Sequence, residues 1–337
     1  MATLSVVHKT TYRYARPVEL GEHRLMCRPR DSHDLRLLDT GLIIQPAARV
    51  RWLHDAFANS IAVASFAEPA EELYFESSFS AEHYPAGAAG IEIEPYARVY
   101  PFHYSFQDMP DLVRTVERHY PDPEREIDQW ARGFLDQSRT RDTLELLSAI
   151  NGAIKEQFEY ARREEVGTQS PVDTLRRGAG SCRDFALFMM EAARSLGFAA
   201  RFVSGYLYDE ALIGASSALV GGGATHAWMQ VFLPGAGWVE FDPTNALFGG
   251  RNLIRVAVAR DAAQAAPLSG SFTGTADDFL GMEVQVLVTA HPAGARAQDG
   301  SPAPAAAPES AAAAPSASSG AAPREAPAAS GSPAPAR

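Results

Sequence analysis

One cysteine of this chain stands where a nucleophile could be positioned. Cys182 follows Ser181 in the stretch GAGSCRDFA and is one of only two cysteines among 337 residues. A free cysteine is commonly a small buried apolar residue, so the surrounding sequence has to decide its role. The apolar residues from Phe185 to Leu196 recur at helical spacing, and this pattern predicts a helix that begins at the cysteine.

The predicted helix start would favour chemistry at this thiol. N–H groups in the first turn have no partners within the helix, and the helix dipole is positive there, so both effects favour the thiolate. The same N–H groups could bind an oxyanion. Gly178 and Gly180 would let the backbone turn tightly before the helix. We expect Ser181 to cap the helix and Asp184 to support its N-terminus electrostatically.

A nucleophilic cysteine needs a base, and the base needs a group that orients it. The stretch THAWMQVFLPGAGWVEFDPTN, residues 225–245, predicts two strands around the turn PGAG and supplies His226 and Asp242. A register that places Asp242 opposite Trp228 leaves it diagonal to His226, about 7–8 Å away and within reach of the imidazole. A slip of one residue would move Asp242 to the other face. The hairpin and the helix start therefore predict a Cys–His–Asp relay.

Strand-like and helical stretches follow one another in blocks. Residues 1–105 have mostly the β-branched and aromatic composition of strands, residues 106–160 have helical period, and residues 199–290 return to strands. The Gly-rich and Ser-rich residues 209–224 predict a mobile loop. Residues 291–337 are almost wholly Ala, Pro, Ser and Gly, which predicts a disordered tail. The pattern favours an α+β fold class.

Composition excludes several kinds of partner. The formal net charge is -11 and the pI is about 5.3, which disfavours nucleic acid and anionic membranes as partners. Two cysteines are too few for a disulfide scaffold or a thiolate metal cage. The sequence has no basic and apolar leader and no apolar window long enough for a membrane span. We therefore expect a cytoplasmic protein whose thiols stay reduced.

Three motifs in order carry a resemblance to a known family. GAGSCRDFA, RFVSGY and THAWMQVFLPGAGWVEFDPTN resemble the bacterial transglutaminase-like cysteine peptidase superfamily, and TYRYARPVELGEHRLMCRPRD resembles the β-rich domain that precedes its core. PLSGSFTG resembles the stretch before the last core strand. The resemblance implies an antiparallel β domain over residues 1–105 and a papain-like core over residues 106–290. In such a core, the helix with the cysteine packs on an antiparallel sheet with the histidine and aspartate.

The resemblance also implies a reaction. Cys182 would be the nucleophile on a carboxamide, His226 the general base and acid, and Asp242 the residue that orients the imidazole. A thioester acyl-enzyme would form and water would hydrolyse it, as in a cysteine peptidase or amidase acting on a protein or peptide. The resemblance implies no cofactor and no metal, because the calcium sites of animal transglutaminases have no counterpart here.

A second oxyanion donor is harder to place. Eukaryotic members use an upstream tryptophan, but no tryptophan lies between Trp130 and Cys182. The candidates that could assist the Cys182 backbone N–H or contact the substrate are Tyr160, Gln169 and Trp228.

Other interpretations remain open at this stage. A protein cross-linking transglutaminase would use the same residues with a lysine amine in place of water. A catalytically idle interaction module is the third class, in which Cys182 and His226 would be ordinary core residues. Asp242 precedes Pro243 and could merely shape a turn. A mononuclear zinc site built from the three relay residues has suitable ligand types but lacks a closely spaced ligand pair.

Overall fold

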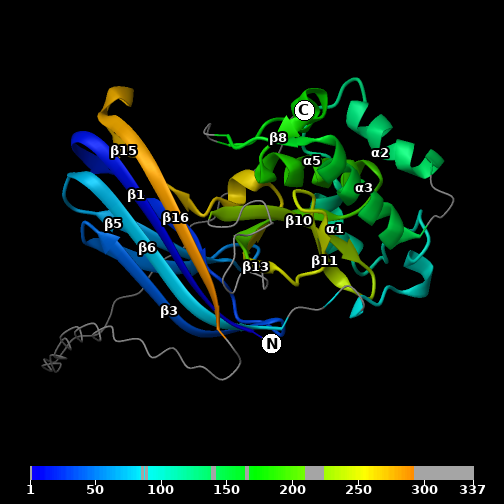
Figure 1. Ribbon diagram of the computed structural model, residues 1–337, viewed down its shortest axis with the longest axis horizontal. Coiled ribbons are helices and arrows are strands. Elements are labelled where there is room, and N and C mark those ends of the chain that lie inside the picture. Colours follow the sequence, from blue (N-terminus) through cyan, green and yellow to red (C-terminus); the bar gives the residue numbers. More distant parts are fainter. Residues whose placement is uncertain are drawn as a thin grey trace, which may run out of the picture. The chain divides into compact units, whose positions relative to one another are not determined.

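The computed structural model describes residues 2–84, 87, 90–137, 142–163, 167–208 and 224–291. Most of the expected tail (residues 291–337) and of the expected loop (residues 209–224) lies outside the described residues. Helices and antiparallel sheets combine as the α+β prediction requires, so the fold class is confirmed (Figure 1).

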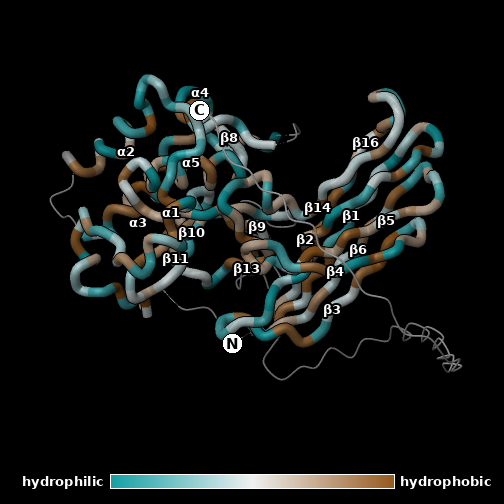
Figure 2. Tube along the Cα trace, turned by 180° about the vertical axis from the view of Figure 1, so that it is seen from behind, coloured by the Kyte–Doolittle hydropathy of each residue, from teal (hydrophilic) through white to brown (hydrophobic). Residues whose placement is uncertain are grey.

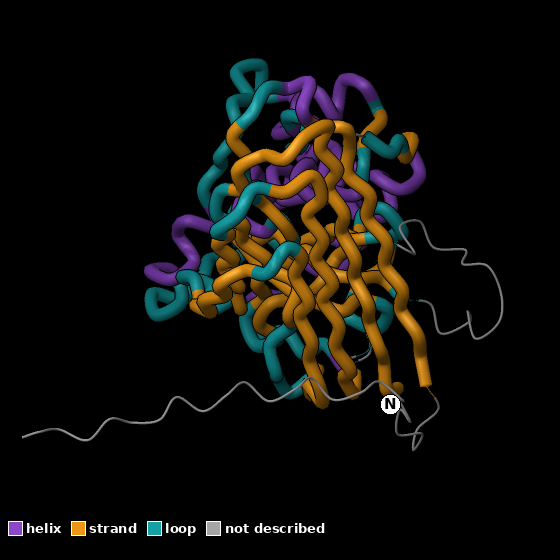
Figure 3. The backbone as a smooth tube through the Cα atoms, turned by 90° about the vertical axis from the view of Figure 1, so that its left-hand side faces the viewer, coloured by secondary structure: helices purple, strands orange, loops and turns teal. Residues whose placement is uncertain are grey.

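Long antiparallel strands form the sheets of the N-terminal region (Figure 3). One sheet has the order β15-β1-β6-β3, with β16 also paired to β1, and another has the order β14-β2-β5-β4. Buried residues alternate with partly buried ones along most of β6, as expected of a sheet with one covered face. The strands of this region carry both hydrophobic and hydrophilic residues along their length (Figure 2). The strands are β1 (Ala2–Leu20), β2 (His23–Arg28), β3 (Leu35–Gln45), β4 (Ala48–His54), β5 (Ser60–Phe66), β6 (Ala70–His83), β14 (Leu268–Ser269), β15 (Phe272–Thr273) and β16 (Phe279–His291).

The last described strand returns to the first sheet. The strand pattern of residues 199–290 predicts that residues 282–290 belong to the core, but β16 pairs with β1 from Thr3↔His291 to Tyr14↔Phe279. A strand as long as β1 exposes backbone N–H and C=O groups along both edges, and β16 satisfies those on the side away from β6. The limits of separately folding domains stay a prediction.

A third antiparallel sheet, of order β12-β11-β10-β9-β13, carries the histidine and aspartate strands. Helix α5 packs against β10 and β9, and almost all of its residues are buried. The other helices surround α5 (Figure 1). The elements are α1 (Met109–Val116), α2 (Glu126–Gln137), α3 (Thr143–Gln157), α4 (Pro171–Arg177), α5 (Cys182–Ser195), β7 (Glu159–Tyr160), β8 (Ala179–Gly180), β9 (Ala200–Leu207), β10 (Thr225–Leu233), β11 (Gly237–Asp242), β12 (Leu247–Phe248) and β13 (Leu253–Ala259).

Contacts between distant parts of the chain join the sheet of β1, β6 and β3 to the sheet that contains β9 and β13. The His8 imidazole lies 2.9 Å from the Tyr206 hydroxyl, and the His83 imidazole lies 3.1 Å from the Tyr208 hydroxyl. Apolar residues such as Leu4 from β1 share one buried cluster with Tyr206 and with residues of β13. Strand β9, which pairs with the histidine strand β10, is therefore packed directly on the N-terminal sheet that contains β1.

Candidate active site

Cys182 is the first residue of α5, as its sequence predicts. Ser181 is the N-cap, and both its backbone N–H and its hydroxyl donate to Asp184 Oδ2 at 2.8 Å. The helical ladder begins when the Phe185 N–H donates to the Ser181 carbonyl at 3.0 Å. The Cys182 N–H precedes that ladder, so helix geometry leaves it available to an oxyanion. The cysteine is 8% exposed.

A buried carboxylate fixes the turn before the cysteine. Asp184 is fully buried and also accepts a hydrogen bond from the Gln169 backbone N–H at 2.7 Å. It forms an ion pair with Arg163 at 3.0 Å. Burial alone would raise the pKa of Asp184, but the hydrogen bonds from Ser181 and Gln169 and the charge of Arg163 lower it. Asp184 therefore supports the N-terminus of α5, as predicted.

Two glycines allow this close packing. Gly178 ends α4 in the left-handed conformation, with φ 59°. A Cβ on Gly180 would lie 2.9 Å from the Asp184 Cβ and 3.1 Å from Gln169 Nε2. Gly180 is needed because the chain has to pass directly against these two side chains.

The histidine and the aspartate meet across the β10–β11 hairpin. Met229 pairs with Phe241, and this register puts Asp242 opposite Trp228. His226 Nε2 lies 2.9 Å from Asp242 Oδ2, and both side chains are fully buried. The predicted diagonal geometry is thus what the hairpin adopts.

Two residues that the sequence analysis did not single out complete the aspartate's environment. The Thr244 backbone N–H donates to Asp242 Oδ1 at 3.0 Å, and Asn245 Nδ2 donates to Asp242 Oδ2 at 2.8 Å. These bonds and the His226 charge lower the pKa of Asp242 although burial opposes them. The motif DPTN is the sequence feature that indicates these hydrogen bonds, because a turn directly after the aspartate brings the next polar groups back to it.

The surroundings of His226 favour its charged form. Burial lowers the pKa of the imidazole, but the Asp242 carboxylate and, to a smaller extent, the Cys182 thiol raise it to about 10. His226 Nδ1 is buried and has no hydrogen-bond partner within the described part of the chain. Because Nε2 is bound to Asp242, Nδ1 is the ring nitrogen left for the neighbouring thiol. This arrangement can hold a thiolate–imidazolium pair.

The three further candidates have different surroundings. Tyr160 lies opposite Gly180 in the β7–β8 pair, is 36% exposed, and has its pKa raised by burial and then by Cys182. Gln169 is buried, and its Nε2 donates to the Ala179 carbonyl at 3.0 Å, so its side chain braces the turn. Trp228 is fully buried and stacks on the His226 ring at 5.9 Å. Only Tyr160 of the three is both open to solvent and next to the thiol.

Arginines stand near the same tyrosine. The charges of Arg162 and Arg183 both act to lower the pKa of Tyr160, against the larger effect of burial. Arg162 is exposed and Arg183 is half-buried in the first turn of α5. Nothing in the sequence distinguishes these arginines from other surface charges, because only the fold brings residues 162 and 183 to one place.

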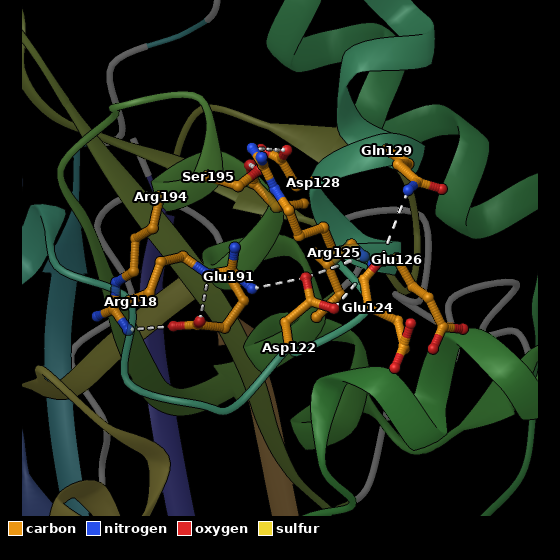
Figure 4. A network of polar contacts seen from close by, with 12 residues as sticks. Arg118, Asp122, Glu124, Arg125, Glu126, Asp128, Gln129, Glu191, Arg194 and Ser195 are labelled. Carbon is orange, nitrogen blue, oxygen red and sulfur yellow. Dashed lines mark hydrogen bonds and ion pairs between the residues drawn. The ribbon is translucent and has the colours of Figure 1, made fainter.

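A buried ion-pair network holds the other half of α5 (Figure 4). Glu191 and Arg194 pair at 2.9 Å with both side chains fully buried, and Arg118 pairs with Glu191 at 2.7 Å. The remaining Arg194 nitrogens donate to the carbonyls of Thr115, Ala200 and Arg260. The donors and acceptors satisfy one another, so this cluster anchors the helix that carries Cys182.

Metal and membrane features are absent from the described ranges. No group of three or more His, Cys, Asp or Glu residues there is arranged to hold a metal ion. None of the helices described is both long and apolar enough to cross a membrane.

Comparisons with known proteins agree with the motifs. The family model of the bacterial transglutaminase-like N-terminal region matches residues 4–82, and that of the transglutaminase-like superfamily matches residues 128–243. The resemblance is therefore confirmed: the chain carries a transglutaminase-like core behind a bacterial transglutaminase-like N-terminal region.

One relative and one solved structure match most of the chain, and a second relative matches about a third of it. The uncharacterized protein Rv2569c of Mycobacterium tuberculosis is 27% identical over 300 residues, which are 84% of this chain and 91% of that protein. The uncharacterized protein ML0607 of Mycobacterium leprae is 35% identical over 119 residues, 35% of this chain and 40% of that protein. The crystal structure of a candidate cysteine protease from Cytophaga hutchinsonii covers 86% of this chain and 91% of that chain, with a TM-score of 0.62 and 19% identity. At that identity, the likeness shows a shared fold.

Proposed function

We propose that the protein is a thiol-dependent hydrolase of carboxamide bonds, a cysteine peptidase or amidase that acts on proteins or peptides. The observation that carries the proposal is the buried His226–Asp242 hydrogen bond beside a cysteine at a helix N-terminus. The candidate cysteine protease of the same fold supports this class of reaction.

In the first step, the Cys182 thiolate attacks the carboxamide carbon, and a C–S bond forms. The Cys182 N–H stabilises the negative charge that develops on the carbonyl oxygen, and the Tyr160 hydroxyl is the second donor. The C–N bond then breaks as the His226 imidazolium gives its Nδ1 proton to the leaving amine. A thioester and a neutral imidazole remain.

In the second step, water attacks the thioester and gives its proton to His226 Nδ1. The carboxylic acid product leaves, and the thiolate–imidazolium pair is restored. Asp242 does not exchange a proton in either step. It holds Nε2–H in a hydrogen bond, so Nδ1 faces the thiol, and it stabilises the imidazolium.

Mass spectrometry of peptide products tests this proposal. A mixed peptide library is incubated with the protein in the presence and absence of a primary amine such as cadaverine. We expect new free carboxyl ends in both samples, and none with Cys182→Ala. Cys27→Ala is the matched control, because Cys27 is the other buried cysteine and should be dispensable. Products that carry the amine in place of a free carboxyl would establish a cross-linking transglutaminase instead. No thiol-dependent product of either kind would contradict the proposal.

A further inference from the structure

A hollow lies beside the strands β10 and β11, which carry His226 and Asp242, but it is separate from these relay residues. Its volume is about 710 Å³, which is within the usual range of small-molecule sites. Loop residues 30–34, the segment around Ile91 and the β10–β11 hairpin line it, and none of the three relay residues does. We call it the Arg201 hollow, after the β9 residue that lines it.

Arg201 is a largely enclosed cation that forms no ion pair with a described residue, although the charge of Glu240 acts on it from a distance. Its guanidinium lies 4.1 Å above the Trp238 ring, and its Nε donates to Gln230 Oε1 at 2.7 Å. Burial and the charge of Arg255 lower the pKa of Arg201 to about 9. Within the described part of the chain, no carboxylate lies within ion-pair distance of this guanidinium, and its terminal nitrogens make no hydrogen bond. Enclosed charges in proteins are normally paired, so the free nitrogens of this guanidinium are suited to an anionic group.

The neighbouring charges are already neutralised by one another. Arg255 lies 2.8 Å from Glu240 and 3.0 Å from Asp34. Glu240 in turn accepts Gln230 Nε2 at 2.9 Å, and this bond turns Gln230 Oε1 toward Arg201. The chain of contacts fixes the Arg201 fork in one orientation, as preorganised recognition of a planar anion requires.

We propose that Arg201 binds the carboxylate of a small organic ligand in this hollow. The guanidinium fork matches a carboxylate in a bidentate manner, and Trp238, Phe57 and Ile91 offer an apolar surface for the rest of the ligand. A single negative charge suits the site better than a phosphate, because acidic side chains also line the hollow and would repel a dianion. These acids are Asp31, Asp34, Glu92 and Glu240.

The hollow is also in physical contact with the relay through Trp228. This side chain belongs to the same apolar cluster as Val258 and Phe57, which line the hollow, and its ring stacks on the His226 ring. The ligand would therefore lie on the Trp228 side of the His226 ring and would not block access to the Cys182 thiol. Binding there needs no catalytic step, so it can be tested whether or not the proposed hydrolase activity is found.

Isothermal titration calorimetry of the whole chain tests the proposal with matched ligands. N-acetyl-L-phenylalanine carries a carboxylate on an apolar body, and its amide keeps the body without the charge. We expect the acid to bind at least about tenfold more tightly than the amide, a difference of about 1.4 kcal/mol. Inorganic phosphate should bind more weakly than the acid. The peptide Ala-Ala-Phe and its C-terminal amide, added to Cys182→Ala, distinguish a free acid from a peptide C-terminus as the source of the carboxylate.

Variants assign the binding to this place. Arg201→Gln should reduce affinity for the acid at least tenfold, whereas Arg49→Gln, at an exposed position that does not line the hollow, should leave it within about twofold. If Arg201→Gln fails to fold, quenching of Trp238 fluorescence by the acid, lost in Trp238→Leu, gives the same assignment. Equal binding of acid and amide, tighter binding of phosphate, or no binding of either carboxylate would overturn the proposal.

Discussion

His226 Nε2 and Asp242 Oδ2 lie 2.9 Å apart with both side chains fully buried, and Nδ1 of the same ring has no hydrogen-bond partner among the described residues. Asp242→Asn should therefore reduce kcat on the order of 10³-fold or more, because an amide cannot hold the ring in the required tautomer. Circular dichroism should show a folded protein. The exposed Asp111→Asn is the control and should keep full activity. An active Asp242→Asn enzyme would exclude the aspartate from the relay.

The thiol should react at acidic pH. Because the His226 imidazolium lies beside Cys182, iodoacetamide should alkylate this cysteine at pH 6 faster than it alkylates a model thiol. Burial raises the pKa of Cys27 to about 12, so Cys27 should label slowly in the same sample. His226→Gln should lower the Cys182 rate. Labelling of Cys182 no faster than the model thiol would mean that the pair does not form.

Stability should depend on pH through the same histidine. The folded-state pKa of His226, about 10, is above the ordinary 6.5, so the folded state holds the proton more tightly than the unfolded state. The resulting stabilisation is complete below about pH 6.5 and is lost as the pH rises toward 10. Urea unfolding of the wild-type chain and of His226→Gln at pH 6 and pH 10 measures it. The difference in the free energy of unfolding should be larger at pH 6, and an equal difference would contradict the assigned charge.

The turn before the cysteine should not accept a side chain. Gly180→Ala would force a Cβ against Asp184 and Gln169 and should cost about 1–3 kcal/mol of the free energy of unfolding. Gly152→Ala is the matched control in α3, where an added Cβ meets no atom within 4 Å. That change should stabilise the protein by about 0.5–1 kcal/mol. Thermal denaturation measures the stability of both variants relative to the wild-type chain. Equal effects of the two changes would argue against close packing at Gly180.

The anchor of α5 should be a stability determinant. Glu191→Ala leaves Arg194 as an unpaired buried charge and should cost about 3–5 kcal/mol. Glu117→Ala removes one partner of an exposed pair with Arg114 and should change stability by less than about 1 kcal/mol. Urea unfolding curves compare the two. A small effect at Glu191 would show that the network contributes little to holding the helix.

Helix boundaries show the limit of reasoning from spacing. The helical period of residues 106–160 predicts helices but not where each one begins, and α2 begins at Glu126. Arg125 adopts a positive φ of 55°, and the Asp122 carboxylate accepts the N–H groups of Glu126 and Ile127. Asp122 thus binds the exposed N–H groups at the start of the helix. The spacing of apolar residues does not predict this contact.

The sequence by itself determined the local parts of the site. The helix start at Cys182, its Ser181 cap and the hairpin register that joins His226 to Asp242 follow from short-range periodicity and turn chemistry, because neighbours in the chain decide them. Tertiary structure alone decided which distant groups meet. The pairing of β16 with β1, the brace made by Gln169 and the position of Arg201 beside Gln230 depend on packing between segments far apart in the chain. A single sequence carries no direct record of such contacts, since long-range pairing and burial arise only when the whole chain folds.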